Sequence, residues 1–250
     1  MRTHAEWQAW AKRDPLWAVA SWSGRERDGA NPWTDEEFYA LGADWLDFDR
    51  AWRDSIGHSS RSILEIGCGA GRITRMLADP FSRVIAVDVA SDAVLYAQSR
   101  VLADNIVWRV GTGDVLPADD ASVDSIFSCH VFQHFHDNAA QLHAFKEIRR
   151  VLLPGGTFFV HIPLHTFPAG HFSAIAHAGY AAFCQLQRLH AHVQRQLMRV
   201  GAKPPMRVVS YEMELLHTHL RTLGFIDVGV SMATIGAGSG VHPCIYGRRS

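Results

Sequence analysis

Short, largely apolar runs alternate with glycine-rich turns and amphipathic stretches through the middle of this 250-residue chain. Runs of this length predict strands buried on both faces, as in a parallel sheet that helices cover. We expect such strands at residues 62–66, 84–87, 106–110 and 123–128, and a fifth after a Pro-Gly-Gly turn within 151–160. An apolar stripe of Leu142, Phe145 and Ile148 predicts a helix before the fifth strand. The alternation indicates an α/β fold with a doubly wound, mostly parallel sheet.

The alternation stops after the fifth strand and later resumes. Residues 165–209 fit no sheet element and carry a helical pattern over about 172–200. We therefore predict a helical insertion at about 165–209, placed either as a lid over a ligand pocket or as a subunit contact. A helix over 212–223 and two strands, at 225–232 and 241–247, are expected to complete the sheet.

Tryptophan is concentrated near the start of the chain. Seven of the eight tryptophans lie in the first 52 residues, and aromatic residues recur there at helical spacing, as in Trp45, Phe48 and Trp52. We predict a Trp-rich helical N-terminal cap over residues 1–58 and one sheet domain over 59–250. The aromatic side chains either pack against the sheet as core or also roof a ligand pocket, and these two roles are compatible.

The first predicted strand runs directly into Gly67, Gly69 and Gly71, and a helical pattern over 72–78 follows. α/β folds bind nucleotide-like ligands at such a turn, because glycine lets the backbone approach the ligand closely. The dinucleotide fingerprint is G-x-G-x-x-G, whereas here the third glycine falls one residue earlier. Glu65 also stands two positions before the first glycine. The spacing therefore favours a related ligand over a dinucleotide.

This turn resembles motif I of the class I S-adenosylmethionine-dependent methyltransferases, which reads Glu/Asp-x-Gly-x-Gly-x-Gly. Further segments follow in the order of that family: Asp88 ends the second strand, Gly113 and Asp114 follow the third, and the Pro-Gly-Gly turn precedes the fifth. The resemblance spans about residues 62–162 and implies a seven-stranded sheet whose last strand is antiparallel. It also implies S-adenosylmethionine as the cofactor and S-adenosylhomocysteine as its product. The alternative is a Rossmann-like domain that transfers no methyl group.

The resemblance implies a set of cofactor contacts. The Asp88 carboxylate would accept hydrogen bonds from the ribose hydroxyls, Asp114 would meet the adenine amino group, and Ser128 would lie by the methionine moiety. Gly42 closes an aromatic-x-x-Gly element that lies near the methionine end of the cofactor in methyltransferases of this kind. The full set of implied cofactor residues is Glu65, Gly67, Gly69, Gly71, Asp88, Val89, Asp114, Val115, Ser128 and Gly42.

Candidate catalytic side chains follow the fourth strand. The segment resembles a family sequence that often reads His-His or Glu-His, and Gln133 and His134 match these two positions. Imidazole titrates near neutral pH, so His134 is a candidate general base for a hydroxyl acceptor. His130 and His161 are further candidates at the same edge of the sheet. The alternative for His134 is a structural role, either capping the next helix or shaping the pocket.

The chain has 15 histidines and four cysteines, but their spacing leads us to predict no protein-bound metal. The chain has no H-E-x-x-H pattern, and histidines two residues apart on a helix, such as His217 and His219, face different directions. The cysteines lie far apart and form no C-x-x-C pair, so neither a zinc site nor a disulfide framework is expected. A divalent ion shared with a diol substrate stays open as an alternative.

Composition and charge exclude several classes of partner. The formal net charge is -1 and no long basic run is present, so we expect no nucleic-acid partner. We expect neither a signal-peptide core nor a membrane-spanning run, and therefore a cytoplasmic protein. The fourth strand also lacks the Asn/Asp-Pro-Pro-Tyr/Phe ending of many nucleic-acid amino methyltransferases. The predicted partner is a small molecule, and the insertion at 165–209 is a candidate homodimer contact.

The residues and the resemblance together predict methyl transfer from S-adenosylmethionine to a small-molecule acceptor. The favoured acceptor atom is a hydroxyl oxygen of a natural-product intermediate or a sugar. N- or C-methylation of such a molecule is one alternative. A non-catalytic scaffold that binds the cofactor without converting it is another.

Overall fold

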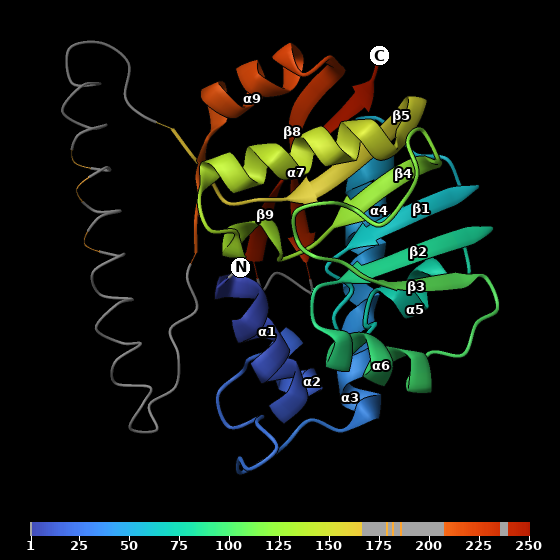
Figure 1. Cartoon of the computed structure of the whole chain (residues 1–250), viewed down its shortest axis with the longest axis vertical. Helices are drawn as coiled ribbons and strands as arrows, with labels where there is room; N and C mark the ends of the chain where they lie inside the picture. Colours follow the sequence, from blue (N-terminus) through green and yellow to red (C-terminus); the bar gives the residue numbers. More distant parts are fainter. Residues whose placement is uncertain (1, 167–178, 180–181, 183–185, 187–207, 236–239) are drawn as a thin grey trace.

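The fold is given by a computed structural model of the chain (Figure 1). It describes residues 2–166, 179, 182, 186, 208–235 and 240–250. The helix expected at about 172–200, and with it most of the insertion predicted at 165–209, lies outside the described residues.

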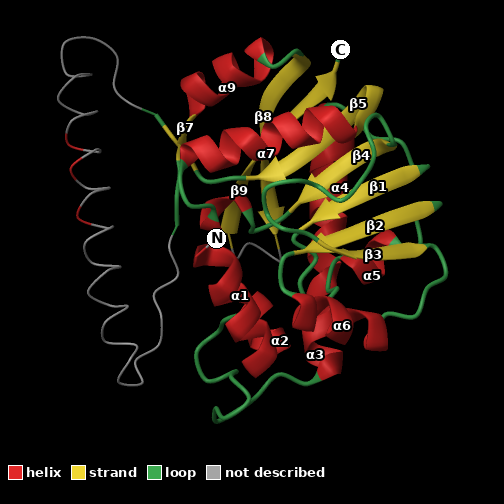
Figure 2. Ribbon diagram, viewed as in Figure 1, coloured by secondary structure: helices red, strands yellow, loops and turns green. Residues whose placement is uncertain are grey.

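A seven-stranded sheet forms the centre of the molecule, in the order β3-β2-β1-β4-β5-β9-β8 (Figures 1 and 2). Its strands are β1 (Ser62–Ile66), β2 (Arg83–Asp88), β3 (Ile106–Val110), β4 (Val123–Ser128), β5 (Leu152–His161), β8 (Phe225–Ile235) and β9 (Gly240–Arg249). Strands β1 to β5 pair in parallel, whereas β9 is antiparallel to both β5 and β8. The predicted sheet, including its antiparallel strand, is confirmed.

Helices cover both faces of this sheet, as the doubly wound prediction requires (Figure 2). One layer contains α4 (Asp44–Ser55), α5 (Thr74–Leu77) and α6 (Ser91–Arg100), and the other contains α7 (Asn138–Val151) and α9 (Met213–Thr222). Side chains along β1 alternate between the two layers, so that Ile63 packs in the first core and Leu64 in the second. The chain begins with α1 (Arg2–Arg13), α2 (Pro15–Val19) and α3 (Asp35–Ala40).

The aromatic residues of α4 belong to the core of the sheet. Trp45, Phe48 and Trp52 are at most 2% exposed. The Trp52 ring stacks on Phe159 of β5 and on Phe127 of β4, with ring centroids 5.6 and 6.3 Å apart. For these residues the interpretation of the tryptophan-rich segment as core packing is therefore correct.

A second, two-stranded sheet was not predicted. It pairs β6 (Leu164–His165) in parallel with β7 (Tyr211–Glu212), with Leu164 opposite Tyr211. Strands of two residues are too short for a periodic pattern to reveal. Their pairing means that the chain returns at Tyr211 to the place that it left at Leu164.

The sequence predicts neither a membrane-spanning segment nor a disulfide framework, and the described part of the chain bears on both. None of its helices is long and apolar enough to cross a membrane. Its cysteines, Cys68, Cys129 and Cys244, are free.

We expect Trp52→Ala to lower the free energy of unfolding by about 3–5 kcal/mol, because loss of a fully buried indole leaves a cavity between α4 and the sheet. Equilibrium unfolding in urea measures this change. Trp22→Ala is a matched control, since Trp22 is 57% exposed and its removal should cost less than about 1 kcal/mol. A Trp52 variant as stable as this control would contradict the core position of α4.

Candidate functional site

The turn after β1 has a backbone that requires glycine. Gly67 and Gly69 have φ angles of 79° and 52°, in the left-handed region that L side chains rarely adopt. Space is also restricted, because a Cβ on Gly67 would lie 2.1 Å from Val131 and one on Gly69 would lie 2.4 Å from Val19. The turn is therefore in close contact with the loop after β4 and with the N-terminal cap.

The helix after this turn is shorter than predicted. The helical pattern covers 72–78, but α5 is a single turn at Thr74–Leu77. Residues 69–73 form turns instead, and the Gly71 N–H donates to the Cys68 carbonyl oxygen at 2.9 Å. The feature offered to a ligand at this position is the glycine turn itself, and not the start of a long helix.

Asp88, at the end of β2, connects the glycine turn to the start of α6 through two hydrogen bonds. One carboxylate oxygen accepts from the Gly69 N–H and the other accepts from the Ala90 N–H, each at 2.8 Å. Burial raises the pKa of Asp88, and the two N–H donors oppose that shift. A carboxylate has about four lone-pair sites, so Asp88 retains capacity to accept further hydrogen bonds from a ligand.

Glu65, in the middle of the sheet, is a buried acid. Its side chain accepts a hydrogen bond from the Thr74 hydroxyl at 2.5 Å, and the residue is 4% exposed. Burial raises the pKa of Glu65 to about 7, while the Thr74 hydrogen bond and the nearby Arg72 guanidinium lower it. The acid that the sequence singles out before the glycine turn therefore titrates near neutral pH.

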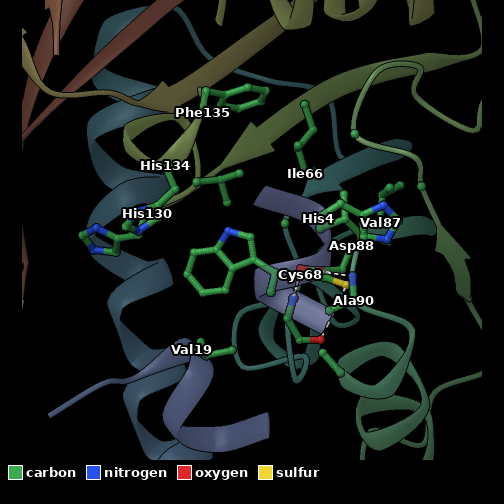
Figure 3. Close-up of a pocket in the computed structure, with 18 of the residues that line it drawn as sticks. His4, Val19, Ile66, Cys68, Val87, Asp88, Ala90, His130, His134 and Phe135 are labelled. Carbon is green, nitrogen blue, oxygen red and sulfur yellow. Dashed lines mark hydrogen bonds between the residues drawn. The ribbon is translucent and has the colours of Figure 1, made fainter. Parts of the chain in front are cut away.

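These groups meet in a cavity of about 470 Å³ (Figure 3), within the range of about 300–1,000 Å³ typical of small-molecule sites. Asp88 and Ala90 lie on one side of it, and His130 and His134 lie on the other. The predicted cofactor residues that line the cavity are Glu65, Gly67, Gly69, Asp88, Val89, Asp114 and Val115. The structure thus brings both predicted catalytic histidines and most of the predicted cofactor residues to one site.

Three predicted cofactor residues lie behind this lining: Gly42, Gly71 and Ser128. A Cβ on Gly42 would lie 2.5 Å from the Arg72 carbonyl oxygen, and one on Gly71 would lie 3.0 Å from a side chain of α6. Ser128 is buried and donates through Oγ to the Ile66 carbonyl oxygen at 2.9 Å. These three residues support the turn or its strand, and the cofactor contact implied for them stays a prediction.

The N-terminal cap closes the cavity. His4, Trp7 and Ala11 line it from α1, and residues 18–22 line it from the end of α2 and the chain beyond. The Gln8 side chain fixes α1 in place, since its Oε1 accepts from the N–H of Ser91 at the start of α6 at 2.7 Å. The roofing interpretation of the cap therefore also holds. Sequence analysis missed these individual residues, because their only local signal is a helical pattern.

His134 lies in a 3-10 turn (Phe132–His134) between β4 and α7, where its ring meets the cap. The ring packs edge-on against Trp7, with centroids 5.1 Å apart, and its Nε2 lies 3.0 Å from the side-chain Nε2 of Gln133. An amide NH₂ is a donor, so the imidazole Nε2 in this arrangement is an acceptor. Helix capping is not its role, because Asp137 caps α7 by accepting from the Ala140 N–H at 2.9 Å.

A second group of histidines lies near His134 and is called the histidine trio below: His130 after β4, His161 at the end of β5, and His242 in β9. The nitrogens that could bind a ligand all lie within 4.8 Å of one another. Sequence analysis placed His130 and His161 at one edge but missed His242. The available signal was the antiparallel last strand, which begins at the edge where parallel strands end and here pairs Cys244 with His161.

The histidine trio is neutral at pH 7. Burial lowers the pKa of His130 to about 4 and that of His161 to about 3, and it also lowers the pKa of His242. Repulsion from the neighbouring imidazoles adds to the shift at His130 and His161. A group with so low a pKa is a poor proton acceptor at neutral pH. His130 is therefore a poor candidate for the general base at neutral pH.

Known proteins match this chain in sequence and in fold. Residues 64–160 match the family described as a methyltransferase domain. The chain is 37% identical over 105 residues to a probable S-adenosylmethionine-dependent methyltransferase of Mycolicibacterium smegmatis, covering 42% of this chain and 39% of that protein. It is 29% identical over 185 residues to a malonyl-[acyl-carrier protein] O-methyltransferase of Serratia marcescens, covering 74% and 66%. Its fold resembles magnesium protoporphyrin IX methyltransferase of Synechocystis PCC 6803 with bound S-adenosylhomocysteine, with a TM-score of 0.56 at 13% identity over 94% of this chain and 93% of that one.

Residues 64–160 match a methyltransferase domain, and the strand order with its antiparallel β9 is the fold of the class I S-adenosylmethionine-dependent methyltransferases. The matched regions span 39% and 66% of the lengths of the two relatives. The cofactor of this class is S-adenosylmethionine, and the cavity fits it in two respects. Its glycine turn leaves no room for a Cβ at Gly67 or Gly69, and Asp88 can accept hydrogen bonds from ribose hydroxyls.

We expect the pH dependence of stability to report Glu65. Its pKa rises from an ordinary value of 4.5 to about 7 on folding, so the folded chain binds a proton that the unfolded chain does not. The ionised Glu65 should therefore lower the free energy of unfolding by roughly 1–3 kcal/mol above pH 7. This loss should shrink as the pH falls from 7 towards 5, because the folded chain takes up the proton.

Glu65→Gln, which mimics the protonated acid, should be more stable than the wild type at pH 8 and should lose this pH dependence. Urea unfolding at several pH values between 5 and 8 measures both effects. Glu36→Gln, at an exposed acid of α3, is the control and should keep the wild-type slope. An unchanged slope in Glu65→Gln would show that Glu65 is not the titrating group.

Proposed function

We propose that this protein transfers the methyl group of S-adenosylmethionine to a hydroxyl oxygen of a small molecule. The supporting observation is that one cavity runs from Asp88 at one side to His134 at the other. Methyl transfer to a hydroxyl needs a site that holds the cofactor in line with the acceptor, and it benefits from a group that removes the hydroxyl proton. The O-methyltransferase of Serratia marcescens among the relatives supports oxygen as the acceptor atom.

The cofactor would lie along the glycine turn. Asp88 would accept hydrogen bonds from both ribose hydroxyls while keeping its two backbone N–H donors. Asp114, in the loop after β3, would meet the adenine amino group, and Val89 and Val115 would contact the base. Glu65 would lie towards the methionine end, where its Thr74 hydrogen bond limits its movement. The valines make the adenine side apolar, and the two aspartates supply its specific acceptors.

S-adenosylmethionine supplies an electrophilic methyl group, and the side chains at the opposite end of the cavity would prepare the acceptor. His134 Nε2 would take the hydroxyl proton as the new carbon–oxygen bond forms, in place of the hydrogen bond that it accepts from Gln133. Trp7 would hold the imidazole ring edge-on and, with the rest of the roof, keep water from the reacting atoms.

We favour a hydroxylated natural-product intermediate or a sugar as the acceptor, with N- or C-methylation of a small molecule as the alternatives. The direct test is incubation with methyl-labelled S-adenosylmethionine and a panel of hydroxylated small molecules. Label in one acceptor, with an equal amount of S-adenosylhomocysteine, would support the proposal. Cofactor binding without S-adenosylhomocysteine formation for every acceptor would indicate a scaffold instead. The homodimer predicted through residues 165–209 rests on residues outside the described ones.

We expect Asp88→Ala to weaken S-adenosylmethionine binding about tenfold or more, because each lost charge-assisted hydrogen bond costs about 1.5–3 kcal/mol. Calorimetric titration of the folded variant measures this. Asp79→Ala, at an exposed acid ahead of β2, is the control and should bind as the wild type does. Wild-type affinity in Asp88→Ala would remove the ribose assignment. NAD binding by the wild type, without S-adenosylmethionine binding, would favour a dinucleotide site.

His134→Ala should lower kcat by about 10²–10⁴-fold, since a positioned general base contributes this much. Cofactor affinity should change by less than about threefold, because the interaction is made only in the transition state. Steady-state kinetics with the acceptor found above, together with calorimetry, separates the two quantities. His217→Ala, at a partly exposed histidine of α9, should leave both unchanged. Near-normal kcat in His134→Ala would assign this ring a purely structural role.

A further inference from the structure

The histidine trio is not used by the methyl transfer proposed above, although one member lines the same cavity. We propose that His130, His161 and His242 bind one divalent transition-metal ion of the zinc type, and that the open coordination position of this ion takes an oxygen of the acceptor. The metal site stands on the geometry of the trio alone. The role of the open position rests on the proposed function.

The spacing of the trio suits one shared ion. All ligand nitrogens lie within 4.8 Å of one another, and the ring centroids are 4.5, 5.0 and 5.1 Å apart. Zinc–nitrogen bonds of about 2.0–2.1 Å place tetrahedral ligand atoms about 3.3 Å apart. Closure onto an ion therefore shortens each nitrogen–nitrogen separation by at most about 1.5 Å, which small rotations of the partly exposed His130 and His242 rings can supply.

The backbone at His130 is held in an unusual conformation. Its φ angle is 58°, in the left-handed region that non-glycine residues rarely adopt and that costs on the order of 1 kcal/mol or more. In this conformation the ring stands within 5.0 Å of both His161 and His242, centroid to centroid. Strained residues of this kind concentrate at functional sites, and here the strain holds one imidazole against two others.

Hydrogen bonding shows which ring nitrogen of His161 holds a lone pair. Its Nδ1 accepts a long hydrogen bond, 3.3 Å, from the backbone N–H of His130. In the neutral ring Nδ1 is therefore the nitrogen that holds the lone pair, and Nε2 carries the proton. Metal ligation through Nδ1 would exchange one weak contact for a coordinate bond and would leave the Nε2–H as a donor.

The chemistry of the trio selects the type of ion. Three neutral imidazoles offer three lone pairs, and no aspartate, glutamate or cysteine joins the group among the residues that the structure describes. Nitrogen donors favour zinc, cobalt, nickel or copper, whereas magnesium and calcium require oxygen ligands.

Three protein ligands leave a zinc-type ion with an open position. His130 lines the cavity on the same side as His134 (Figure 3), so this position would face the acceptor end. An acceptor oxygen bound there would become more acidic, because a bound cation lowers the pKa of a coordinated hydroxyl. The proton lost from the hydroxyl would pass to His134, which is next to the trio. The acceptor class would then be a molecule whose hydroxyl oxygen binds the ion and is methylated, and a second, neighbouring oxygen could bind if the ion expands to five-coordinate.

The test uses the full chain without a polyhistidine tag, freed of metal by a chelator. Titration with Co²⁺ should give the visible bands of a four-coordinate ion, saturating at one ion per chain, and Zn²⁺ should remove them. Mg²⁺ should have no effect. His242→Ala and His161→Gln should each weaken Co²⁺ and Zn²⁺ binding by at least about tenfold. His217→Ala, outside the trio, should bind as the wild type does. S-adenosylmethionine affinity confirms that each variant is folded, and His242→Ala alone suffices if the buried His161 tolerates no change.

Acetohydroxamate or catechol, each a two-oxygen ligand, should shift the Co²⁺ bands if the open position faces the cavity. Binding at less than one ion per chain, or binding that is unchanged in the trio variants, would overturn the metal site. Saturated Co²⁺ bands that neither oxygen ligand shifts would overturn the role given to the open position. These readouts do not need turnover. A chain that passes them but methylates no acceptor would contradict the proposed function and leave the metal site standing.

Discussion

The pocket depends on the two backbone hydrogen bonds that the Asp88 carboxylate accepts. One comes from the glycine turn at Gly69 and the other from Ala90, just before α6, both at 2.8 Å. The next residue, Ser91, donates its own N–H to Gln8 of the roof helix. The glycine turn, α6 and the roof helix α1 are therefore all positioned relative to one side chain. Because the bonds to Gly69 and Gln8 join segments that are distant along the chain, they fix the shape of this side of the cavity.

The two ends of the cavity are formed by different kinds of chemical group. The Asp88 end uses backbone groups and glycines that lie close together along the chain, between Gly67 and Ala90. The opposite end uses imidazole rings that come from distant segments, with His130, His161 and His242 each on a different strand or loop. A backbone site can be changed only by altering the turn, whereas side chains can be exchanged singly. The His130 end of the cavity is therefore the part whose chemistry single substitutions can alter.

Local features were predictable from the sequence, and long-range contacts were not. The strands and the glycine turn were predicted because a short apolar run and a glycine spacing are each complete within a few residues. The start of α5 was misplaced because the helical pattern at 72–78 cannot show the turn that the Gly71 N–H closes. Gly42 was placed at the cofactor from a local resemblance, but its packing on Arg72 depends on how the cap docks. The position of His242 required knowing which strand pairs with β5.

The β6–β7 pair bears on how such a molecule can diversify. Leu164 lies opposite Tyr211 in this pair, and the Tyr211 N–H donates to the Pro163 carbonyl oxygen, so the chain leaves the fold and returns to it at one point. When the ends of a segment are already held together, added length raises the closure entropy only slowly, by about 0.6 kcal/mol for each doubling. The length of the segment between these two short strands can therefore change at small entropic cost while β5 and Asp88 keep their places. Growth or shortening of the chain at this junction needs no compensating substitution in the seven-stranded sheet.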